Sequence, residues 1–325
     1  MEPAPEDLIR FTRDWAALGL DDAACVGLAV SGGPDSCALL LLAAAHCPER
    51  IAVATVDHGL RAAAAAEAQE VAALCARLRV PHATLKIDLG GGRAIQARAR
   101  TARYAALAGW AGAQGLAGLA TAHHLDDQAE TLAMRLNRGA GVRGLAGMRT
   151  QAIVPGSRGL PLWRPLLGWR RADLAAVVAR AGVVAADDPS NRDGRFERVR
   201  VRAGLAGADW LDPAGWAASA QHLGEADAAL DWAARQLFAQ GWQSADDGRG
   251  GMLAVPADLP QALALRLLEQ VLAALDAGAN APRGAELARW HGALAQGQVA
   301  TLAGLRGEGR GAIWHFSRAA PHRAG

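Results

Sequence analysis

The sequence predicts an α/β protein with a doubly wound parallel sheet, followed by a smaller, mainly helical C-terminal domain. The first half alternates short apolar runs with helical stretches, an order typical of strands joined by helices that cover both faces of a sheet. Polar, glycine-bearing loops follow the apolar runs, and ligands of such sheets bind beyond the carboxyl ends of the strands. After Asp212-Pro213 the pattern becomes helical, so we expect domains at 1–212 and 213–325.

Each element of the first domain is predicted by its own pattern. Short apolar or alternating runs predict strands, and longer alanine-rich or amphipathic stretches predict helices. The expected strands are Val26–Val30, Ile51–Val56, His82–Ile87 and Leu116–Thr121, and the expected helices are one beginning near Pro34, Ala62–Leu78, Ile95–Trp110, Leu125–Asn137 and Arg170–Ala181. Residues 151–168 are rich in glycine and proline and predict a loop with a short strand.

The C-terminal domain is expected to end in a β-hairpin. Leucines at heptad spacing predict helices in its first part. Val299–Leu305 and Ala312–Phe316 are the expected strands, and the glycine-rich stretch 306–311 is the expected turn.

Composition favours a globular protein of the cytoplasm. The chain has 325 residues, of which 51% are hydrophobic and 20% charged, enough for two domains with sizeable cores. No uncharged apolar run of about 18 residues occurs, so we expect no membrane span. The four cysteines all precede residue 76 and none lies two residues from another, which argues against a zinc or iron–sulfur site. Free thiols beside a nucleotide loop favour the cytoplasm.

Positive charge is concentrated in one part of the chain. The net charge is only +2, yet residues 135–202 contain 14 arginines and five acidic residues. Such a basic stripe is typical of a protein with a phosphate-rich partner, although a solvated face has the same composition.

Residues 31–36 predict a phosphate-binding loop. An apolar strand leads into two glycines, and the following helix begins near a proline. The expected ligands are Ser31, Gly32, Gly33, Pro34, Asp35 and Ser36. Glycines let the backbone approach a ligand closely, and the positive end of a helix favours an anion. The common loop that ends in Gly-Lys-Ser/Thr is excluded because Lys86 is the only lysine. The alternative is a tight turn that needs small residues.

A second motif, Thr121–Thr131, follows the fourth strand. Asp35 from the first loop and Asp127 from this motif could supply carboxylates to a nucleotide-bound Mg²⁺. The second of two consecutive histidines, His124, is a candidate for catalysis. Acidic residues in a first helical turn also complement the helix dipole, and that alternative stays open. We expect Asp127 and Glu130 to face the strand ends or solvent.

Other polar residues form weaker candidates. Asp57 follows the second strand, where an acid can contact a nucleoside, although it could equally stabilise its own loop. Arg100 and Arg103 lie on one helical face, with Tyr104 beside Arg100. Arginine suits phosphate because it is always charged and binds in a bidentate manner. In the segment 187–202, acidic residues could hold a substrate amine and arginines could follow a nucleic-acid backbone.

The first loop resembles the Ser-Gly-Gly-x-Asp-Ser signature of PP-loop ATP pyrophosphatases. Over residues 25–205, the ordered motifs resemble the tRNA(Ile)-lysidine synthetase family: the loop, Val56–Arg61, Gln96–Tyr104, Thr121–Thr131, Asn137–Gly141, Arg164–Leu167 and Asp187–Asp193. The resemblance implies a PP-loop fold and ATP-dependent attachment of free L-lysine to carbon 2 of the wobble cytidine of tRNA(Ile) with a CAU anticodon. An adenylated cytidine would be the intermediate, and AMP and pyrophosphate the products.

The same resemblance implies a role for each candidate residue. Catalysis would use Asp35, Arg103, His124 and Asp127. ATP would be held by residues 31–36 with Asp57 and Arg100, and Mg²⁺ by Asp35 and Asp127. Lysine or tRNA would contact Arg138, Arg164, Asp187, Asp188, Asn191, Arg195 and Arg198.

Two other functions stay open, and a homodimer is compatible with the sequence. A PP-loop tRNA thiolase would need a persulfide or an iron–sulfur cluster, and no cysteine follows Cys75. A non-catalytic ATP-sensing module would have no use for His124 or Asp127. Pyrophosphate release distinguishes the three activities.

Overall fold

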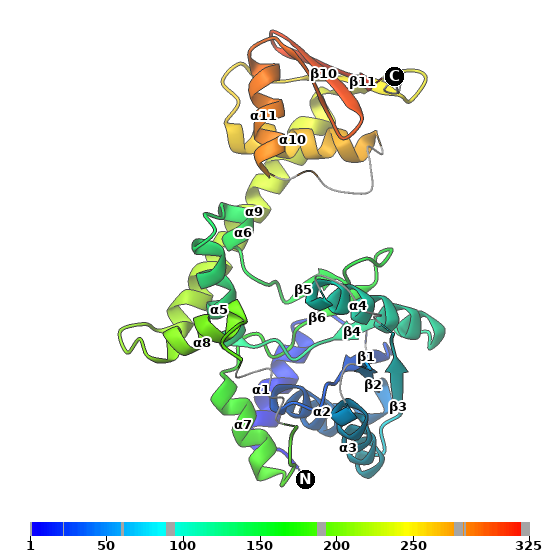
Figure 1. Cartoon of the computed structure of the whole chain (residues 1–325). Coiled ribbons are helices and arrows are strands. Elements are labelled where there is room, and N and C mark those ends of the chain that lie inside the picture. Colours follow the sequence, from blue (N-terminus) through cyan, green and yellow to red (C-terminus); the bar gives the residue numbers. More distant parts are fainter. Residues whose placement is uncertain are drawn as a thin grey trace. The chain divides into compact units, whose positions relative to one another are not determined.

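The computed structural model describes residues 2–21, 23–59, 62–88, 95–186, 193–275, 282 and 284–319, with only the backbone described at 62–64 and 95–97. Two compact units, Met1–Gly224 and Glu225–Gly325, are described separately (Figure 1). The division falls inside helix α9 (Pro213–Gly241), whereas the sequence suggested 212/213. Helix α9 does begin at Pro213, but in its first part Ala220 is buried and lies beside Gly147 of unit 1.

A six-stranded sheet forms the centre of the described part of unit 1. Its strand order is β3-β2-β1-β4-β6-β5, and all neighbours run parallel except β5 against β6. The strands are β1 (Val26–Ala29), β2 (Ile51–Asp57), β3 (His82–Lys86), β4 (Gly118–Ala120), β5 (Gln151–Ile153) and β6 (Pro161–Trp163). The expected parallel α/β class is therefore confirmed, and the segment 151–168 contains two short strands instead of one.

Helices cover both faces of this sheet, as the doubly wound prediction requires. The described helices of unit 1 are α1 (Pro5–Ala16), α2 (Pro34–His46), α3 (Ala62–Leu78), α4 (Ile95–Ala113), α5 (Leu125–Leu136), α6 (Val142–Leu145), α7 (Arg171–Arg180) and α8 (Glu197–Ala206), with the 3₁₀ helix η1 (Pro48–Arg50). Helices α1, α2, α3 and α7 share one apolar core. Helix α4 packs through Tyr104 and Leu107 into a separate core on the sheet. Each face thus presents its own helices to the strand ends.

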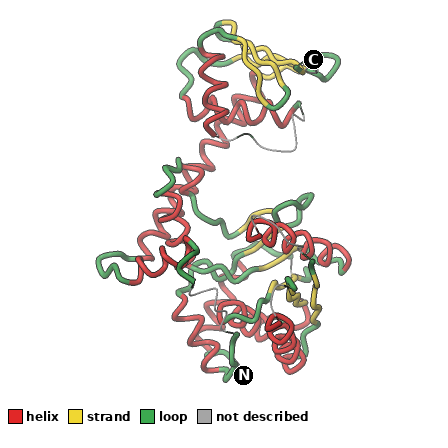
Figure 2. Tube along the Cα trace, viewed as in Figure 1, coloured by secondary structure: helices red, strands yellow, loops and turns green. Residues whose placement is uncertain are grey.

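Unit 2 combines helices with a second sheet (Figure 2). The described strands are β7 (Trp242–Ser244), β8 (Gly250–Ala254), β9 (Val299–Leu302), β10 (Leu305–Arg310) and β11 (Ile313–Arg318), paired antiparallel in the order β7-β8-β11-β10-β9. Helices α10 (Gln261–Ala274) and α11 (Gly284–Ala295) pack on this sheet around Leu267, Trp290 and Phe316. Arg266 of α10 binds Asp227 of α9 at 2.5 Å and also binds Asp231.

The C-terminal hairpin was predicted, but its turn was placed wrongly. The glycine-rich stretch expected as a turn is strand β10 itself, and it pairs with both β9 and β11. A side chain at Gly309 would collide with the backbone carbonyl of Leu294, and one at Gly307 would lie 3.0 Å from Trp290. The glycines therefore let helix α11 pack directly against the strand backbone.

Candidate active site at the strand ends

The phosphate loop lies where the sequence placed it, between β1 and α2. Gly32 has a φ of +89°, in the left-handed region that favours glycine. The Ser36 hydroxyl donates to the Gly33 carbonyl at 2.9 Å and accepts from the Ser31 N–H at 3.2 Å. Gly33 is the N-cap of α2 and no side chain caps this helix. The positive end of α2 is therefore open to an anion.

His124 joins this loop to helix α5. Its side chain is 1% exposed, and its Nδ1 accepts the Asp127 N–H at 3.3 Å while the Asp127 carboxylate accepts the His124 N–H at 3.1 Å. This reciprocal cap directs Nε2 towards two carboxylates, 3.4 Å from Asp35 Oδ2 and 3.5 Å from Asp127 Oδ2. Asp35 from the phosphate loop and His124 and Asp127 from the second motif thus form one cluster.

The carboxylates of Asp35 and Asp127 are compatible with a magnesium ion that enters the site with a nucleotide. Asp35 Oδ1 is buried and has no hydrogen-bond partner among the described residues. No group of three or more potential ligands that could hold a metal without a substrate occurs among the described residues. Mg²⁺ commonly takes only one or two carboxylates and completes its shell with phosphate oxygens and water. Asp35 and Asp127 fit that requirement.

A buried carboxylate, Glu130, organises three arginines beside this cluster. Its side chain is 2% exposed and accepts from Arg198 at 2.7 Å, Arg202 at 2.7 Å and Arg171 at 3.0 Å. We name these four residues the Glu130 group. Burial alone would raise the pKa of Glu130, but the hydrogen bonds from Arg202 and Arg198 lower it to about 2. Glu130 therefore stays ionised and holds α8 and α7 against α5.

Sequence reasoning missed the structural role of Glu130. We expected it to face the strand ends or solvent, and this was wrong because α7 and α8 cover it. Its arginine partners lie 41, 68 and 72 residues away in the chain, so no local pattern could indicate them. Arg198, expected to contact substrate, also donates to Asp127 at 2.9 Å and so lies beside the candidate metal ligands.

A second set of arginines lies at the ends of β4 and β6. Arg100 and Arg103 place their guanidinium carbons 5.1 Å from the centroid of the Tyr104 ring. The helical spacing predicted the contact with Arg100. Arg164 follows β6 and is 8% exposed. His123 follows β4, and burial, followed by the charges of Arg164, Arg103, Arg198 and Arg100, lowers its pKa to about 3. We name Arg100, Arg103, Tyr104, His123 and Arg164 the Arg164 group.

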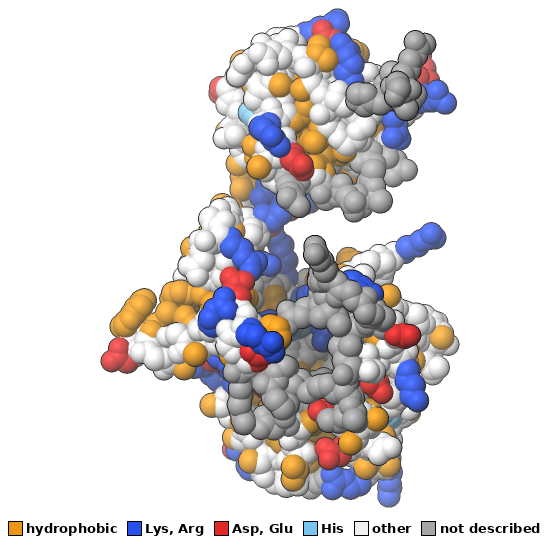
Figure 3. All heavy atoms as spheres, viewed as in Figure 1, with side chains coloured by type: hydrophobic (Ala, Val, Ile, Leu, Met, Phe, Trp, Pro, Cys, Tyr) orange, Lys and Arg blue, Asp and Glu red, His pale blue; other side chains and the backbone are white. Residues whose placement is uncertain are grey.

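The remaining candidates differ in their surroundings. The Asp57 carboxylate accepts the Gly59 N–H at 2.9 Å. This bond is the one expected if Asp57 stabilises its own loop. Arg138 pairs with Glu197, and Arg195 pairs with Asp193 at 2.6 Å with 86% of its side chain exposed. These pairs lie on or next to α8, where basic and acidic side chains gather on the surface (Figure 3).

Asp187, Asp188 and Asn191 lie outside the described residues. Ala186, the last described residue before them, donates its N–H to the Gly32 carbonyl at 2.9 Å. Ala186 therefore lies directly beside the phosphate loop.

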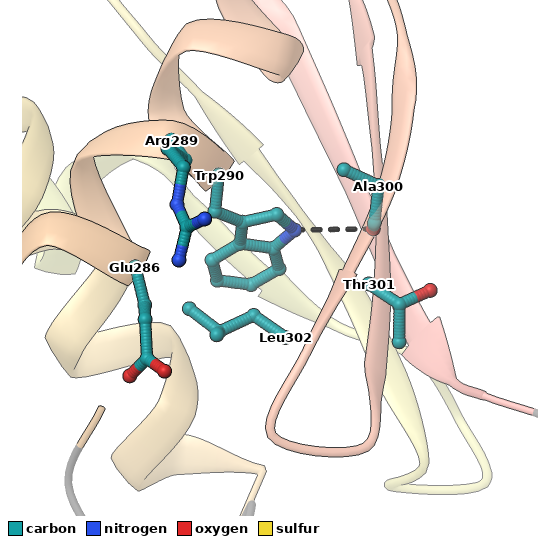
Figure 4. A pocket seen from close by; sticks show the side chains of 6 residues that line it. All are labelled: Glu286, Arg289, Trp290, Ala300, Thr301 and Leu302. Carbon is teal, nitrogen blue, oxygen red and sulfur yellow. Dashed lines mark hydrogen bonds between the residues drawn. The ribbon is translucent and has the colours of Figure 1, made fainter. Parts of the chain in front are cut away.

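Unit 2 has a pocket of its own. It has a volume of about 250 Å³ and lies between α11 and β9, lined by Glu286, Arg289, Trp290, Ala300, Thr301 and Leu302 (Figure 4). Trp290 forms a wall and donates its indole N–H to the Ala300 carbonyl at 3.1 Å. No residue expected to carry chemistry lines it.

The fold and the phosphate loop define a PP-loop protein, and comparison with known proteins agrees. A family model for the PP-loop domain matches residues 7–208, which supports the use of ATP. The tRNA(Ile)-lysidine synthase of Novosphingobium aromaticivorans is 56% identical over 315 residues, covering 97% of this chain and 94% of the relative. That of Zymomonas mobilis is 38% identical and covers 92% and 89%. The chain belongs to the tRNA(Ile)-lysidine synthase family.

Among solved structures, a U34-tRNA thiolase from Methanococcus maripaludis with a [4Fe-4S] cluster has a TM-score of 0.54 and 16% identity. The match covers 68% of this chain and 80% of the thiolase, and it shows a shared fold. Among the described residues, no helix combines the length and apolar character needed to cross a membrane.

Proposed function

We propose that the chain joins free lysine to carbon 2 of the wobble cytidine of tRNA(Ile) in two steps that consume ATP. In the first step the C2 oxygen attacks the α-phosphorus of ATP, the bond to pyrophosphate breaks, and the cytidine becomes adenylated. In the second step the lysine amine attacks C2, the C–O bond to AMP breaks, and the amine loses a proton. Family membership and the cluster at the strand ends support this activity.

One observation carries the chemical proposal: the phosphate loop, Asp35 and Asp127 meet around the buried His124. The open N-terminus of α2 can bind the polyphosphate through backbone N–H groups. His124 Nε2 lies 3.4 Å from Asp35 Oδ2 and 3.5 Å from Asp127 Oδ2, so both carboxylates border the same region. Charge that develops on the leaving pyrophosphate would then meet fixed donors instead of water.

Asp35 and Asp127 would hold a Mg²⁺ ion, which would neutralise charge on the polyphosphate when bound. The unpartnered Asp35 Oδ1 supports this assignment. His124 and Arg198 both contact Asp127 and would hold its carboxylate in position beside the ion.

The lysine would bind near the segment that contains Asp187 and Asp188. Two carboxylates suit a cationic amine, and Ala186 fixes the start of this segment to the phosphate loop. The amine would then be close to the adenylated base. A homodimer and a cytoplasmic location stay predictions, and sedimentation equilibrium would test the first.

The tRNA would reach this site with its wobble base unstacked. Anticodon loops suit such a step, because unpaired bases can be splayed outward. The arginines of residues 135–202 would meet the RNA backbone, although the structure has Arg138 and Arg198 in ion pairs. A CAU anticodon is part of the proposal.

The experiment that tests the activity measures two products. Wild-type protein with Mg²⁺ and ATP should release pyrophosphate only when the tRNA transcript is present, and should transfer radiolabelled lysine into RNA. A thiolase would need a sulfur donor, and an ATP sensor would release no pyrophosphate. Failure to label the RNA under any of these conditions would reject the proposal.

A substitution at Asp35 tests the role of the cluster. Asp35→Asn should reduce pyrophosphate formation by at least about 100-fold, because the metal and His124 lose a charged partner, while tRNA affinity stays close to that of the wild type. Glu49→Gln, an exposed carboxylate of η1, is the matched control and should leave both properties unchanged. Equal loss of tRNA binding and adenylation in Asp35→Asn would contradict this division of roles.

A further inference from the structure

Among the described residues, no carboxylate forms an ion pair with Arg100, Arg103 or Arg164, the three positive charges of the Arg164 group. Arg100 and Arg103 lie on α4 with their guanidinium carbons 5.1 Å from the centroid of the Tyr104 ring, and Arg164 follows β6. The charges of all three add to burial in lowering the pKa of His123. Arg100 is exposed and Arg164 is buried, so the group extends from the surface into the protein.

Several polar atoms of this group are buried without a partner. Among the described residues, Arg103 Nε, Arg164 Nε and the Tyr104 hydroxyl make no hydrogen bond. Tyr104 is 0% exposed. Buried donors without acceptors destabilise a fold, and so does the approach of like charges. The arrangement is what a binding site requires when its ligand is an anion with several acceptor oxygens.

We propose that the Arg164 group binds a phosphodiester of the RNA substrate. The inference rests on the proposed function, because it needs an RNA whose base enters the site. A phosphodiester offers a permanent charge and two free oxygens, which suit guanidinium donors. The Tyr104 hydroxyl and the neutral His123 would complete the polar lining.

The position of the group favours RNA over the phosphates of ATP. The phosphate loop leads into α2, whose core lies on one face of the sheet. Tyr104 belongs to the core under α4 on the other face. Two anion sites therefore flank the strand ends from opposite faces. A base that reaches the α-phosphate of ATP brings its own phosphodiesters with it, and a second cationic site would offset their repulsion.

The inference also unites residues to which the sequence gave separate roles. Arg103 was expected in catalysis, Arg100 at the nucleotide and Arg164 at lysine or tRNA. Their common position indicates one function. His123 and Tyr104, which had no assigned role, become part of the same site.

The test compares RNA binding with nucleotide binding. Arg100→Met, Arg103→Met and Arg164→Met each remove one charge, and tRNA binding to the full chain is measured across a series of salt concentrations. We expect each variant to lower the slope of log affinity against log salt by about one unit. The affinity for a non-hydrolysable ATP analogue should stay within about twofold, since its phosphates bind at the loop. Arg77→Met on α3, also exposed, is the control of equal charge and should behave as the wild type.

The outcomes separate the inference from the proposed function. A weaker ATP analogue affinity with an unchanged salt slope would assign the group to the nucleotide and overturn the inference. Unchanged values for both ligands would also overturn it. Arg100 is exposed, so Arg100→Met keeps the test valid even if the substitutions at buried positions prevent folding. Absence of lysine transfer by the wild type would reject the proposed function without altering these binding results.

Discussion

Two groups of arginines lie near the same strand ends, and their charges are met in opposite ways. In the Glu130 group, one buried carboxylate binds three guanidiniums and connects α5 with α7 and α8. In the Arg164 group, three guanidiniums surround a tyrosine and a histidine, and the described residues provide no acid. In the first arrangement each charge has a partner, and removing one partner would leave a buried charge unpaired. The second leaves buried polar atoms without partners, a cost that a bound anion would offset.

The strongest test of this contrast is Glu130→Gln. The substitution leaves three arginines around a neutral side chain in a buried position, so we expect the free energy of unfolding to fall by about 3–5 kcal/mol. Urea denaturation followed by circular dichroism measures the change. Glu197→Gln, which breaks the surface pair with Arg138, is the control and should cost less than about 1 kcal/mol. Equal losses in the two variants would show that Glu130 is not the centre of the group.

As the pH is lowered, the Arg164 group should lose stability at a higher pH than the Glu130 group. His123 has a folded pKa of about 3 against 6.5 in the unfolded chain, so the unfolded state binds more protons between these values. Stability should therefore fall as pH decreases below 6.5, by at most about 1.4 kcal/mol per pH unit from this group. Glu130, with a folded pKa of about 2 against 4.5, contributes stability that is lost only below pH 4.5.

Melting temperatures between pH 7 and pH 5 measure the histidine effect. His123→Asn keeps a partner for Thr121, which binds Nδ1 at 2.8 Å, and should melt with a weaker pH dependence than the wild type. His222→Asn on the exposed surface of α9 is the control and should retain the wild-type dependence. Identical curves for wild type and His123→Asn would show that burial and the surrounding arginines do not keep His123 neutral.

The two groups should also respond differently when an arginine is removed. Arg202→Met removes a partner of the buried Glu130 and should reduce the free energy of unfolding by about 1–3 kcal/mol. Arg103→Met removes a charge that lies near other positive charges, so we expect stability to stay unchanged or to rise by up to about 1 kcal/mol. Denaturation of both variants under the same conditions gives the comparison. A large loss in Arg103→Met would contradict the assignment of the Arg164 group to binding.

Features with a local sequence pattern could be predicted, whereas contacts between distant parts of the chain could not. Strands β1 to β4 and helices α2, α3, α4, α5 and α7 were predictable because each carries its own local pattern, whereas α6 and the second short strand in 151–168 were not predicted. The phosphate loop and His124 were predictable because parallel strands end at the same edge. The Glu130 group was not, since its members approach one another only after α7 and α8 fold back.

Strands β7, β8 and β10 of the second sheet were not predicted, whereas β9 and β11 lie where the hairpin strands were expected. Strands β8 and β10 carry glycines at buried positions, so the usual alternation of apolar and polar residues is absent. At Gly307 and Gly309 the neighbouring helix occupies the space of a side chain. A sequence pattern cannot distinguish such a strand from a glycine-rich turn.

The smallest expected effect concerns Arg195, which belongs to neither group. Its ion pair with Asp193 is local and exposed, so Arg195→Ala should leave the melting temperature unchanged. If Arg195 contacts the tRNA backbone, as the sequence suggested, the salt slope of binding should fall by about one unit. Arg198→Ala should differ, because Arg198 binds Asp127 and Glu130 and its loss should reduce stability as well as binding. An unchanged slope in Arg195→Ala would remove this residue from the RNA contact and leave the Arg164 group as the better-supported site for the backbone.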